Sequence, residues 1–266
     1  MVVFVTGASS GIGAALAREF ARRGADLALA ARRADRLETL ADEVRALGRR
    51  ALVVACDVTR DGDLETAVAT TREAFGRIDV VVANAGFTVV GRLERLSLED
   101  YRRQFETNVF GVLRTVYATL DDLKRSRGRL AILGSVSGHL ASPSNSPYAM
   151  SKFAVRALAG SLRHELRPAG VTVTLISPGY VESELRLVDN QGLLRPNAKD
   201  GAPAWLRMPT DKAARQIVTA IERGRRDAVI TGHGKALVFL FRHAPGLMNA
   251  LMALAGDWGR PEAGKP

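Results

Sequence analysis

The chain has 266 residues with 47% hydrophobic content, which suffices for one large domain with a buried core, and no shift in composition marks a second domain. The single cysteine, Cys56, excludes an internal disulfide and fits a reducing, cytoplasmic compartment. The net charge of +10 comes mostly from arginines that fall singly or in pairs on expected helices, and the lack of a basic tail or arm argues against a nucleic-acid-binding protein.

Apolar segments and helical patterns alternate along the first half of the chain. Residues 2–6 form an apolar run that predicts a buried strand, and Met1 precedes it directly, without the basic region or cleavage site of a signal peptide. The pattern then predicts three helices, each followed by a glycine, and three more strands: helices at 11–23, 34–47 and 63–75, and strands at 27–31, 51–55 and 80–83. Nearly continuous apolar strands are typical of a parallel sheet covered on both faces.

The second half continues this alternation. Ser97 and Asp100 have the spacing of a capping box and predict the start of a long helix that extends to about Lys124. Further segments predict helices at 147–167 and 210–223 and strands at 130–133, 171–176 and 228–231. We therefore expect an α/β fold, in which residues 1–232 form a single Rossmann-like, doubly wound parallel sheet of about seven strands with helices on both faces.

A glycine-rich turn, TGASSGIG at residues 6–13, joins the first expected strand to the first helix. Glycines let the backbone approach a pyrophosphate closely, and the helix N-terminus offers free N–H groups to the phosphates. The spacing is GxxxGxG and differs from the GxGxxG of longer Rossmann proteins. A tight turn alone would also need glycine, but between a strand and a helix this segment predicts dinucleotide binding.

The end of the second expected strand bears on the choice of dinucleotide. In NAD-binding proteins, an Asp or Glu about 20 residues beyond the glycine turn holds the ribose 2′-hydroxyl. Here the segment reads Ala31-Arg32-Arg33, and the first carboxylate is Asp35. A guanidinium binds a phosphate through charge-assisted, often bidentate hydrogen bonds, whereas a carboxylate repels it. The segment therefore predicts NADP(H), with Arg32 as the main contact of the 2′-phosphate and Arg33 as a second one, rather than two solvated arginines.

Tyr148 and Lys152 lie four residues apart at the start of the expected helix 147–167, so they share one helical face. A tyrosine with its usual pKa of about 10 is a poor base at neutral pH. A nearby cation lowers that pKa by about 1–3 units, and an oxidised nicotinamide beside the pair would add a second positive charge. The pair therefore predicts acid/base chemistry with a bound nicotinamide cofactor, although the same spacing also arises by chance.

Several separate motifs follow one another along residues 2–232. They are the TGASSGIG turn, Asp57, the Asn84-Ala85-Gly86 segment, Asn108, Ser135, the YAMSK segment at 148–152 and Pro178-Gly179. Together they resemble the short-chain dehydrogenase/reductase family, in the branch with subunits close to this chain in length. The resemblance implies an enzyme that moves a hydride between NADP(H) and a carbonyl or secondary alcohol.

The resemblance also assigns roles to four residues at the reacting end of the site. It implies that Tyr148 donates or takes the hydroxyl proton and that Lys152 lowers the Tyr148 pKa and holds the nicotinamide ribose. Ser135 would orient the substrate oxygen, and Asn108 would bind a water that links Lys152 to solvent. Taken singly, Ser135 could be an ordinary polar residue at a strand end, and Asn108 a satisfied buried amide.

The same resemblance implies a series of cofactor contacts. Asp57 would contact the adenine ring, Asn84 would support the central sheet, and Val181 would touch the nicotinamide carboxamide. Ser183 stands where the family often has threonine, and its hydroxyl can still donate a hydrogen bond. The full expected set of cofactor contacts is Gly7, Ser9, Ser10, Gly11, Ile12, Gly13, Arg32, Arg33, Asp57, Val58, Asn84, Ala85, Gly86, Tyr148, Lys152, Pro178, Gly179, Val181 and Ser183.

Loops at the carboxyl ends of the strands select the substrate in this architecture. The relevant segments are 87–92, 138–146 and 180–208, of which the last is long and predicts a mobile lid. His139 either touches the substrate or is a solvated loop histidine. The apolar lid residues either bind an apolar substrate or only pack the lid onto the body; they are Leu185, Leu187, Leu193, Leu194, Trp205 and Leu206.

Residues 233–266 form an apolar C-terminal extension. Arg242, His243 and Pro245 interrupt its longest apolar stretch, so it is too broken to span a membrane as one helix. The extension could pack on the same domain, form a subunit contact or lie on a membrane surface; its helical stripe consists of Leu247, Met248, Leu251, Met252 and Ala255. The family resemblance implies a homodimer or homotetramer, assembled through the long helices at 98–124 and 147–167.

Other chemistries fit the sequence less well. Residues 134–138 read GSVSG, with valine where the nucleophile elbow GxSxG needs serine. The four histidines lack the spacing of metal ligands, so we expect no metal. Two alternatives to the enzyme remain. One is a catalytically silent dinucleotide-binding regulator, which would be expected to lack Tyr148 or Lys152, and the other is a nucleic-acid-binding protein, which only the charge suggests.

Overall fold

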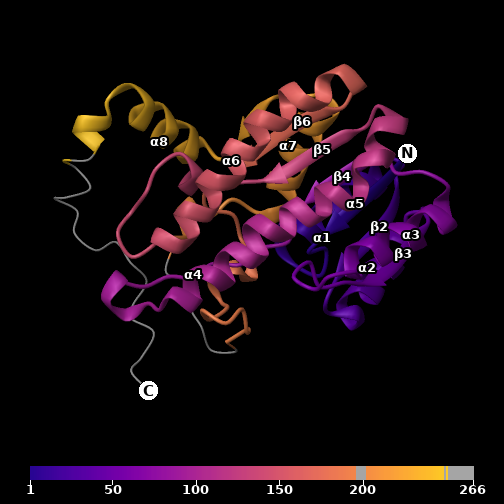
Figure 1. Ribbon diagram of the computed structural model, residues 1–266, viewed down its shortest axis with the longest axis horizontal. Helices are drawn as coiled ribbons and strands as arrows, with labels where there is room; N and C mark the ends of the chain where they lie inside the picture. Colours follow the sequence, from indigo (N-terminus) through magenta and orange to yellow (C-terminus); the bar gives the residue numbers. More distant parts are fainter. Residues whose placement is uncertain (196–201, 249, 251–266) are drawn as a thin grey trace.

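The computed structural model describes residues 1–195, 202–248 and 250, and these residues contain one seven-stranded parallel sheet (Figure 1). The strands are β1 Val2–Thr6, β2 Asp26–Ala31, β3 Ala51–Ala55, β4 Val80–Ala83, β5 Arg129–Leu133, β6 Thr172–Ser177 and β7 Asp227–Val229. Their order is β3-β2-β1-β4-β5-β6-β7. The order reverses between β1 and β4, so the expected doubly wound Rossmann-like fold is confirmed.

Helices cover both faces of this sheet (Figure 1). They are α1 Gly11–Arg22, α2 Ala34–Ala46, α3 Asp63–Phe75, α4 Leu98–Phe105, α5 Gly111–Ser126, α6 Ser146–Leu166, α7 Thr210–Glu222 and α8 Gly232–His243. Successive strand residues point to opposite faces. Accordingly, Val3 and Val5 of β1 pack in one core cluster with α1, α2 and α7, whereas Phe4 packs in the other with α3, α5 and α6.

The continuous apolar strands are buried as expected in the centre of the sheet, but not at its edge. All residues of β1, β2 and β4 are buried, whereas the residues of β3 are half-buried or exposed. β3 has a neighbour on one side only, which is β2. The sequence of Ala51–Ala55 is as apolar as that of a central strand, but this strand lies at the edge of the sheet.

The expected helix from Ser97 to Lys124 is interrupted in the structure. Its capping box is confirmed, because the Ser97 side chain accepts a hydrogen bond from the Asp100 N–H while the Asp100 carboxylate accepts one from the Ser97 N–H. After α4, however, residues Glu106–Phe110 form a π-helical turn before α5 continues. Asn108 lies in this turn and is fully buried. The π-helical turn is a feature that the sequence pattern did not predict.

The start of the C-terminal extension is helical. α8 begins at Gly232, where the Thr231 side chain caps it by accepting a hydrogen bond from the Gly234 N–H. Leu247 is exposed and Met248 is buried, whereas Leu251, Met252 and Ala255 of the expected stripe lie outside the described residues. Among the residues described, no helix has both the length and the apolar character needed to cross a bilayer.

Candidate functional site

A cavity of about 800 Å³ opens at the carboxyl ends of all strands from β3 to β6 in the sheet order. Every expected cofactor contact lines it, from Gly7 to Ser183, together with Ser135. Asn108 is the one expected site residue that does not line the cavity. Because β3 and β6 are five strand spacings apart, the cavity wall spans about 24 Å across the sheet. This shape at the reversal of strand order suits an elongated ligand such as a dinucleotide.

The glycine turn and the first turn of α1 form one wall of the cavity. Ser10 is the N-cap residue of α1, but no side chain caps the helix there, and its first turn contains no acidic residue. The N–H groups at this helix end therefore have no competing side-chain acceptor and can bind a pyrophosphate. Gly7 has a φ of +65°, which favours glycine.

The glycine turn packs tightly on the segment that follows β4. A Cβ atom at Gly13 would lie 2.3 Å from the Gly7 carbonyl oxygen and 2.6 Å from Asn84 Nδ2. Asn84 Nδ2 donates hydrogen bonds to the carbonyl oxygens of Thr6 and Gly7, at 2.9 and 3.1 Å. Asn84 thus holds the end of β1 and the start of the turn in place, and Gly13 is required by this packing.

The two arginines after β2 have different surroundings. The Arg32 side chain is 67% exposed, and among the described residues it forms one ion pair, to Asp57 at 4.0 Å. Arg33 instead lies across the glycine turn, where it donates to the hydroxyls of Ser9 and Ser10 at 2.8–3.2 Å. Asp57 Oδ1 accepts hydrogen bonds from the backbone N–H and the hydroxyl of Thr59. The side chains of Arg32 and Arg33 both line the cavity at the end of β2.

Tyr148 and Lys152 stand on α6 at the other end of the cavity. Lys152 is 5% exposed, and its Nζ lies 5.6 Å from the centre of the Tyr148 ring. Nζ donates to the Leu133 carbonyl oxygen at the end of β5, at 2.7 Å. Burial lowers the pKa of Lys152 to about 8, so its ammonium is mostly charged at neutral pH. Ser135 follows the same strand end, and its hydroxyl accepts a hydrogen bond from the Ser137 N–H.

Asn108 lies behind this end of the cavity and connects three elements. Its Nδ2 donates to the Phe87 carbonyl oxygen at 3.0 Å and to the Ser151 hydroxyl at 3.2 Å, and its Oδ1 accepts from the Phe87 N–H. Ser151 directly precedes Lys152. A Cβ atom at Gly86 would approach Asn108 Oδ1 to 3.0 Å. Asn108 therefore fixes the 86–87 segment against α6, and its expected role in a water relay stays a prediction.

The loop after β6 covers part of the cavity. Of its expected apolar residues, Leu185, Leu193 and Leu194 line the cavity, whereas Leu187 and Leu206 do not. Trp205 is 82% exposed and also lies outside the lining. Asn190, which the sequence did not single out, fastens this loop because its side chain exchanges hydrogen bonds with both backbone groups of Val90, at 2.9 and 3.0 Å.

Two histidines, His139 and His233, hold the segment around the end of β6 in place through hydrogen bonds. His139 does not line the cavity and is not fully solvated: it is half-buried, and its Nε2 lies 2.9 Å from the Ser177 hydroxyl. Burial, with a smaller contribution from Arg156, lowers the pKa of His139 to about 4. His233 Nε2 accepts a hydrogen bond from the Tyr180 N–H at 3.1 Å. α8 thereby supports the Pro178-Gly179 segment, where a Cβ atom at Gly179 would lie 2.6 Å from His233.

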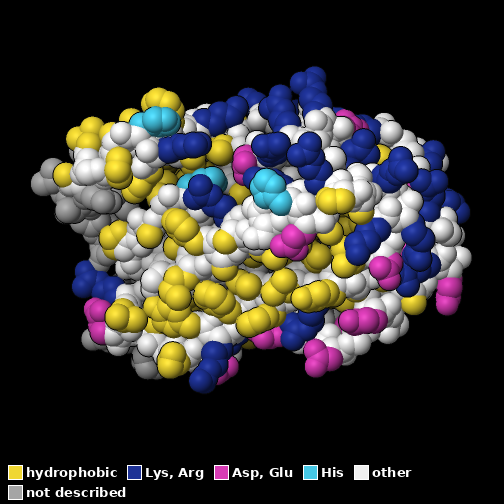
Figure 2. Space-filling view, turned by 45° about the horizontal axis from the view of Figure 1, so that its top comes forward, with side chains coloured by type: hydrophobic (Ala, Val, Ile, Leu, Met, Phe, Trp, Pro, Cys, Tyr) yellow, Lys and Arg dark blue, Asp and Glu magenta, His cyan; other side chains and the backbone are white. Residues whose placement is uncertain are grey.

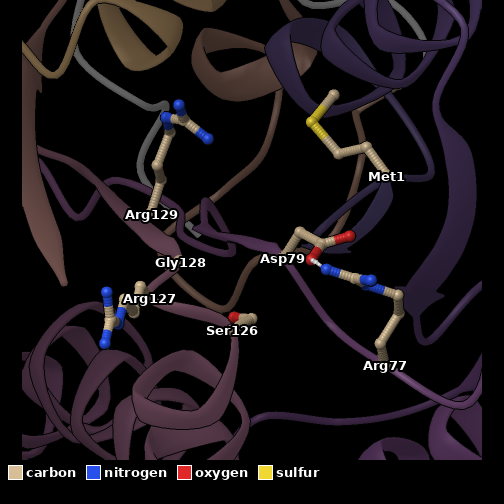
Figure 3. A pocket seen from close by; sticks show the side chains of 7 residues that line it. All are labelled: Met1, Arg77, Asp79, Ser126, Arg127, Gly128 and Arg129. Carbon is tan, nitrogen blue, oxygen red and sulfur yellow. Dashed lines mark hydrogen bonds and ion pairs between the residues drawn. The ribbon is translucent and has the colours of Figure 1, made fainter. Parts of the chain in front are cut away.

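A second hollow, of about 330 Å³, lies at the amino ends of β1, β4 and β5 (Figure 3). There Arg77 pairs with Asp79, which also accepts a hydrogen bond from the Val2 N–H. Arg127 and Arg129 point in different directions in Figure 3. Because these charged groups do not converge, we assign no ligand to this hollow. Within the described part of the chain, no three His, Cys, Asp or Glu side chains meet as a metal site requires.

The comparisons with known proteins agree with this geometry. The model of the short chain dehydrogenase family matches residues 1–192. The 11-beta-hydroxysteroid dehydrogenase A of Sesamum indicum is 37% identical over 237 residues, which are 85% of this chain and 66% of that protein. The chain thus spans slightly less than two thirds of that relative.

Two solved structures have the same fold. An alcohol dehydrogenase from Thermococcus sibiricus, complexed with 5-hydroxy-NADP, has a TM-score of 0.75 and 33% identity, covering 86% of this chain and 95% of that one. A short chain dehydrogenase/reductase from Burkholderia phymatum, in complex with NAD, has a TM-score of 0.82 and 26% identity, covering 93% and 94%. Similar proteins therefore bind either dinucleotide.

Proposed function

The chain belongs to the short-chain dehydrogenase/reductase family and is an oxidoreductase, and from this premise we propose that it transfers a hydride between NADP(H) and the carbonyl or secondary alcohol of an apolar small molecule. One observation carries the proposal. A single cavity joins Tyr148 and Lys152 at one end to the uncapped glycine turn and to Arg32 and Arg33 at the other. We further propose that the protein works in the cytoplasm, where its single cysteine, buried Cys56, stays reduced.

The residues of α6 supply the proton chemistry in this proposal. NADPH, when bound, supplies the hydride that reaches the carbonyl carbon. Tyr148 donates its hydroxyl proton to the carbonyl oxygen, and in the reverse direction it takes the proton back from the alcohol. A tyrosine active at pH 7 needs a pKa shift of about 3 units, or about 4 kcal/mol. The buried Lys152 ammonium supplies part of this shift, because burial reduces the screening of its charge.

The choice of NADP(H) is supported by the end of β2. The only charged side chains directly after β2, at positions 32 and 33, are guanidinium groups, and the first carboxylate, Asp35, does not line the cavity. Arg32 is exposed and weakly paired, so it can turn toward a 2′-phosphate without breaking a strong contact. The solved relatives bind NADP-type or NAD-type ligands, so the fold alone does not select between them.

The proposal of an apolar substrate is supported by the loop after β6. Leu185, Leu193 and Leu194 reach the cavity from this loop, and Phe87 lies on the opposite segment. Such a lining suits a molecule with a large hydrocarbon part. The sesame relative is named a hydroxysteroid dehydrogenase, so steroid ketones belong among the substrates to be tested.

The test is NADPH oxidation against ketones and aldehydes of graded size and polarity, with steroid ketones among them. We expect the highest kcat/KM with large apolar ketones. We expect Tyr148→Phe to lower turnover by about 10²–10⁴-fold, the usual contribution of a general acid, while NADPH binding stays within about twofold of the wild-type value.

Tyr117→Phe is the matched control, because Tyr117 is an exposed tyrosine on α5 outside the cavity. It should leave turnover unchanged. Full activity of Tyr148→Phe would contradict the acid/base assignment. NADPH binding without turnover of any carbonyl compound would favour the silent regulator instead.

A further inference from the structure

Glu184 forms a bridge between two regions that are far apart in the sequence. It stands in the loop after β6, next to Ser183, and lines the cavity. Its Oε2 lies 3.1 Å from Arg33 Nη1 and its Oε1 lies 2.6 Å from Arg36 Nη1. Arg36 belongs to the first turn of α2. The carboxylate therefore ties the loop that covers the cavity to the arginines that follow β2.

The other hydrogen bonds of Arg33 show what Glu184 adds. Nε and Nη2 of Arg33 already donate to the hydroxyls of Ser9 and Ser10. Two serines thus orient the guanidinium across the glycine turn, and Glu184 takes the remaining nitrogen, Nη1. Glu184 is therefore not needed to orient Arg33, but it does supply an anion to it.

We propose that Glu184 competes with the 2′-phosphate of the cofactor for Arg33, and so limits the preference of this protein for NADP(H) over NAD(H). The inference rests on the proposed NADP(H) specificity. The Glu184 carboxylate occupies an anion position on Arg33 and, through Arg36, holds the 183–186 segment on α2. A bound 2′-phosphate replaces Glu184 as the anion that pairs with Arg33, and Glu184 then pairs with Arg36 alone.

The charge of Glu184 is present at neutral pH. Burial tends to raise its pKa, but the hydrogen bonds from Arg36 and Arg33 outweigh burial and hold the pKa of Glu184 below its ordinary value. A 2′-phosphate at Arg33 would then face an ionised carboxylate, and like charges at short range repel. The ion pair is partly exposed, with 39% of Arg33 and 30% of Glu184 accessible, so solvent screens this repulsion and the effect on affinity is moderate.

The competition has a consequence for the loop. Coupling between two binding events is reciprocal, so a ligand that displaces Glu184 from Arg33 also weakens the attachment of the 183–186 segment to α2. Ser183 packs against the glycine turn, because its Cβ atom lies 3.1 Å from the position that a Cβ atom at Gly11 would take. NADP(H) would therefore loosen the 183–186 segment next to the glycine turn, whereas NAD(H), which has no 2′-phosphate, would leave the Glu184 bridge intact.

The test compares two cofactor fragments that differ by one phosphate, 2′,5′-ADP and 5′-AMP, by titration calorimetry. We expect Glu184→Gln to tighten 2′,5′-ADP binding by about three- to tenfold at low salt and to leave 5′-AMP binding unchanged. Glu182→Gln is the matched control. It removes the same charge from the same loop, but Glu182 is exposed and has no ion pair among the described residues, so neither affinity should change.

A second variant tests whether Arg33 carries the effect. In an Arg33→Gln background, we expect Glu184→Gln to change 2′,5′-ADP affinity by less than about twofold, because the contested group is gone. The inference is overturned if Glu184→Gln leaves 2′,5′-ADP binding unchanged or weakens it, or if Glu182→Gln has the same effect as Glu184→Gln.

The proposed cofactor can fail separately from this inference. Equal wild-type affinities for the two fragments would refute the NADP(H) preference. A 2′-phosphate preference that then emerges in Glu184→Gln would still support the competition. A wild-type preference for 2′,5′-ADP that Glu184→Gln does not change would refute the competition alone.

Discussion

Arg32 is the residue on which the proposed dinucleotide preference depends most directly. Within the described part of the chain, its exposed side chain is restrained only by a long ion pair with Asp57, whereas Arg33 is already bonded to two serines and Glu184. A hydrogen bond to a charged group contributes about 1.5–3 kcal/mol. We therefore expect Arg32→Asp to lower the ratio of kcat/KM for NADPH to that for NADH by about ten- to a hundredfold.

A control variant with the same change of charge at another site shows whether the effect of Arg32→Asp comes from its contact with the cofactor or from the net charge of the protein. Lys212→Asp makes the same change of charge at an exposed site in the first turn of α7, outside the cavity. It should leave the ratio within about twofold of the wild-type value, since exposed charges are screened over about 10 Å. An unchanged ratio in Arg32→Asp would refute the role of Arg32.

Lys152 predicts how activity depends on pH. Burial lowers its folded-state pKa to about 8, below its ordinary value of 10.5. The ammonium therefore loses its proton as pH rises through about 8, and the neutral amine no longer stabilises the phenolate that forms when Tyr148 gives up its proton. We expect kcat/KM for ketone reduction, which reports the free enzyme, to fall as pH rises through this value. A profile that stays flat to high pH would contradict this assignment.

The lowered pKa of Lys152 also determines how the stability of the fold depends on pH. Between the folded and unfolded pKa values of Lys152, the unfolded chain binds more protons than the folded one. The contribution of the neutral lysine to stability is therefore fully present above pH 10.5 and is lost as pH falls through about 8. Burial thus makes the charged form of Lys152 unfavourable for the fold, and such perturbed groups cluster at functional sites.

Residues of the site were predictable from the sequence where their partners are close along the chain. Tyr148 and Lys152 are four positions apart, and the glycine turn is one continuous segment. Glu184 was not predictable, because its partners Arg33 and Arg36 lie 151 and 148 positions away and glutamates are common in loops. Only the folded sheet, which places the ends of β2 and β6 around one cavity, brings these charges together.

At the scale of elements, the strands were predicted to within about two residues because apolar runs mark them. The capping box at Ser97 likewise marked the start of α4, since its two hydrogen bonds are local. The π-helical turn at 106–110 was missed because the hydrogen bonds of Asn108 that accompany it run to Phe87 and Ser151, in other elements. π-helical turns often occur at functional sites, and this one places Asn108 beside the residue that precedes Lys152.

Asn108 should therefore matter to stability as well as to the site. Asn108→Leu keeps a similar volume but removes the acceptor of the Phe87 N–H, whereas the Phe87 carbonyl oxygen keeps a second donor, Gln104 Nε2. We expect the free energy of unfolding to fall by about 1–3 kcal/mol, the cost of leaving buried polar groups unpaired. Urea denaturation followed by circular dichroism measures this change.

Asn190→Leu is the matched control for this prediction. Asn190 exchanges the same pair of hydrogen bonds with the backbone of Val90, but Asn190 is half-buried whereas Asn108 is fully buried, so water replaces the lost bonds more readily at Asn190. The free energy of unfolding should fall clearly less in Asn190→Leu than in Asn108→Leu. Equal losses in the two variants would show that the burial of Asn108 does not set its contribution.

At the scale of the whole molecule, one face remains apolar. Figure 2 shows a broad band of apolar side chains on the side where α4, α5 and α6 lie. Large apolar side chains that are exposed on α5, on α6 and in the preceding π-helical turn include Phe110, Tyr117, Met150 and Phe153. Contiguous apolar patches of this kind on a folded chain mark interaction sites. They belong to the same long helices through which the sequence resemblance implies self-assembly.

We therefore propose that α5 and α6 form a two-fold interface between copies of this chain, which light scattering after size exclusion can test. The native mass should be two or four times the 28.6 kDa of one chain.

Tyr117, which is 73% exposed on α5, would be buried in such an interface. Tyr117→Arg places an unpaired charge there and should shift the population toward the monomer, because a desolvated charge without a partner is costly. Leu47→Arg, which alters an exposed leucine after α2, should leave the mass unchanged. A wild-type mass of one chain, or an unchanged mass in Tyr117→Arg, would exclude this face as the site of assembly.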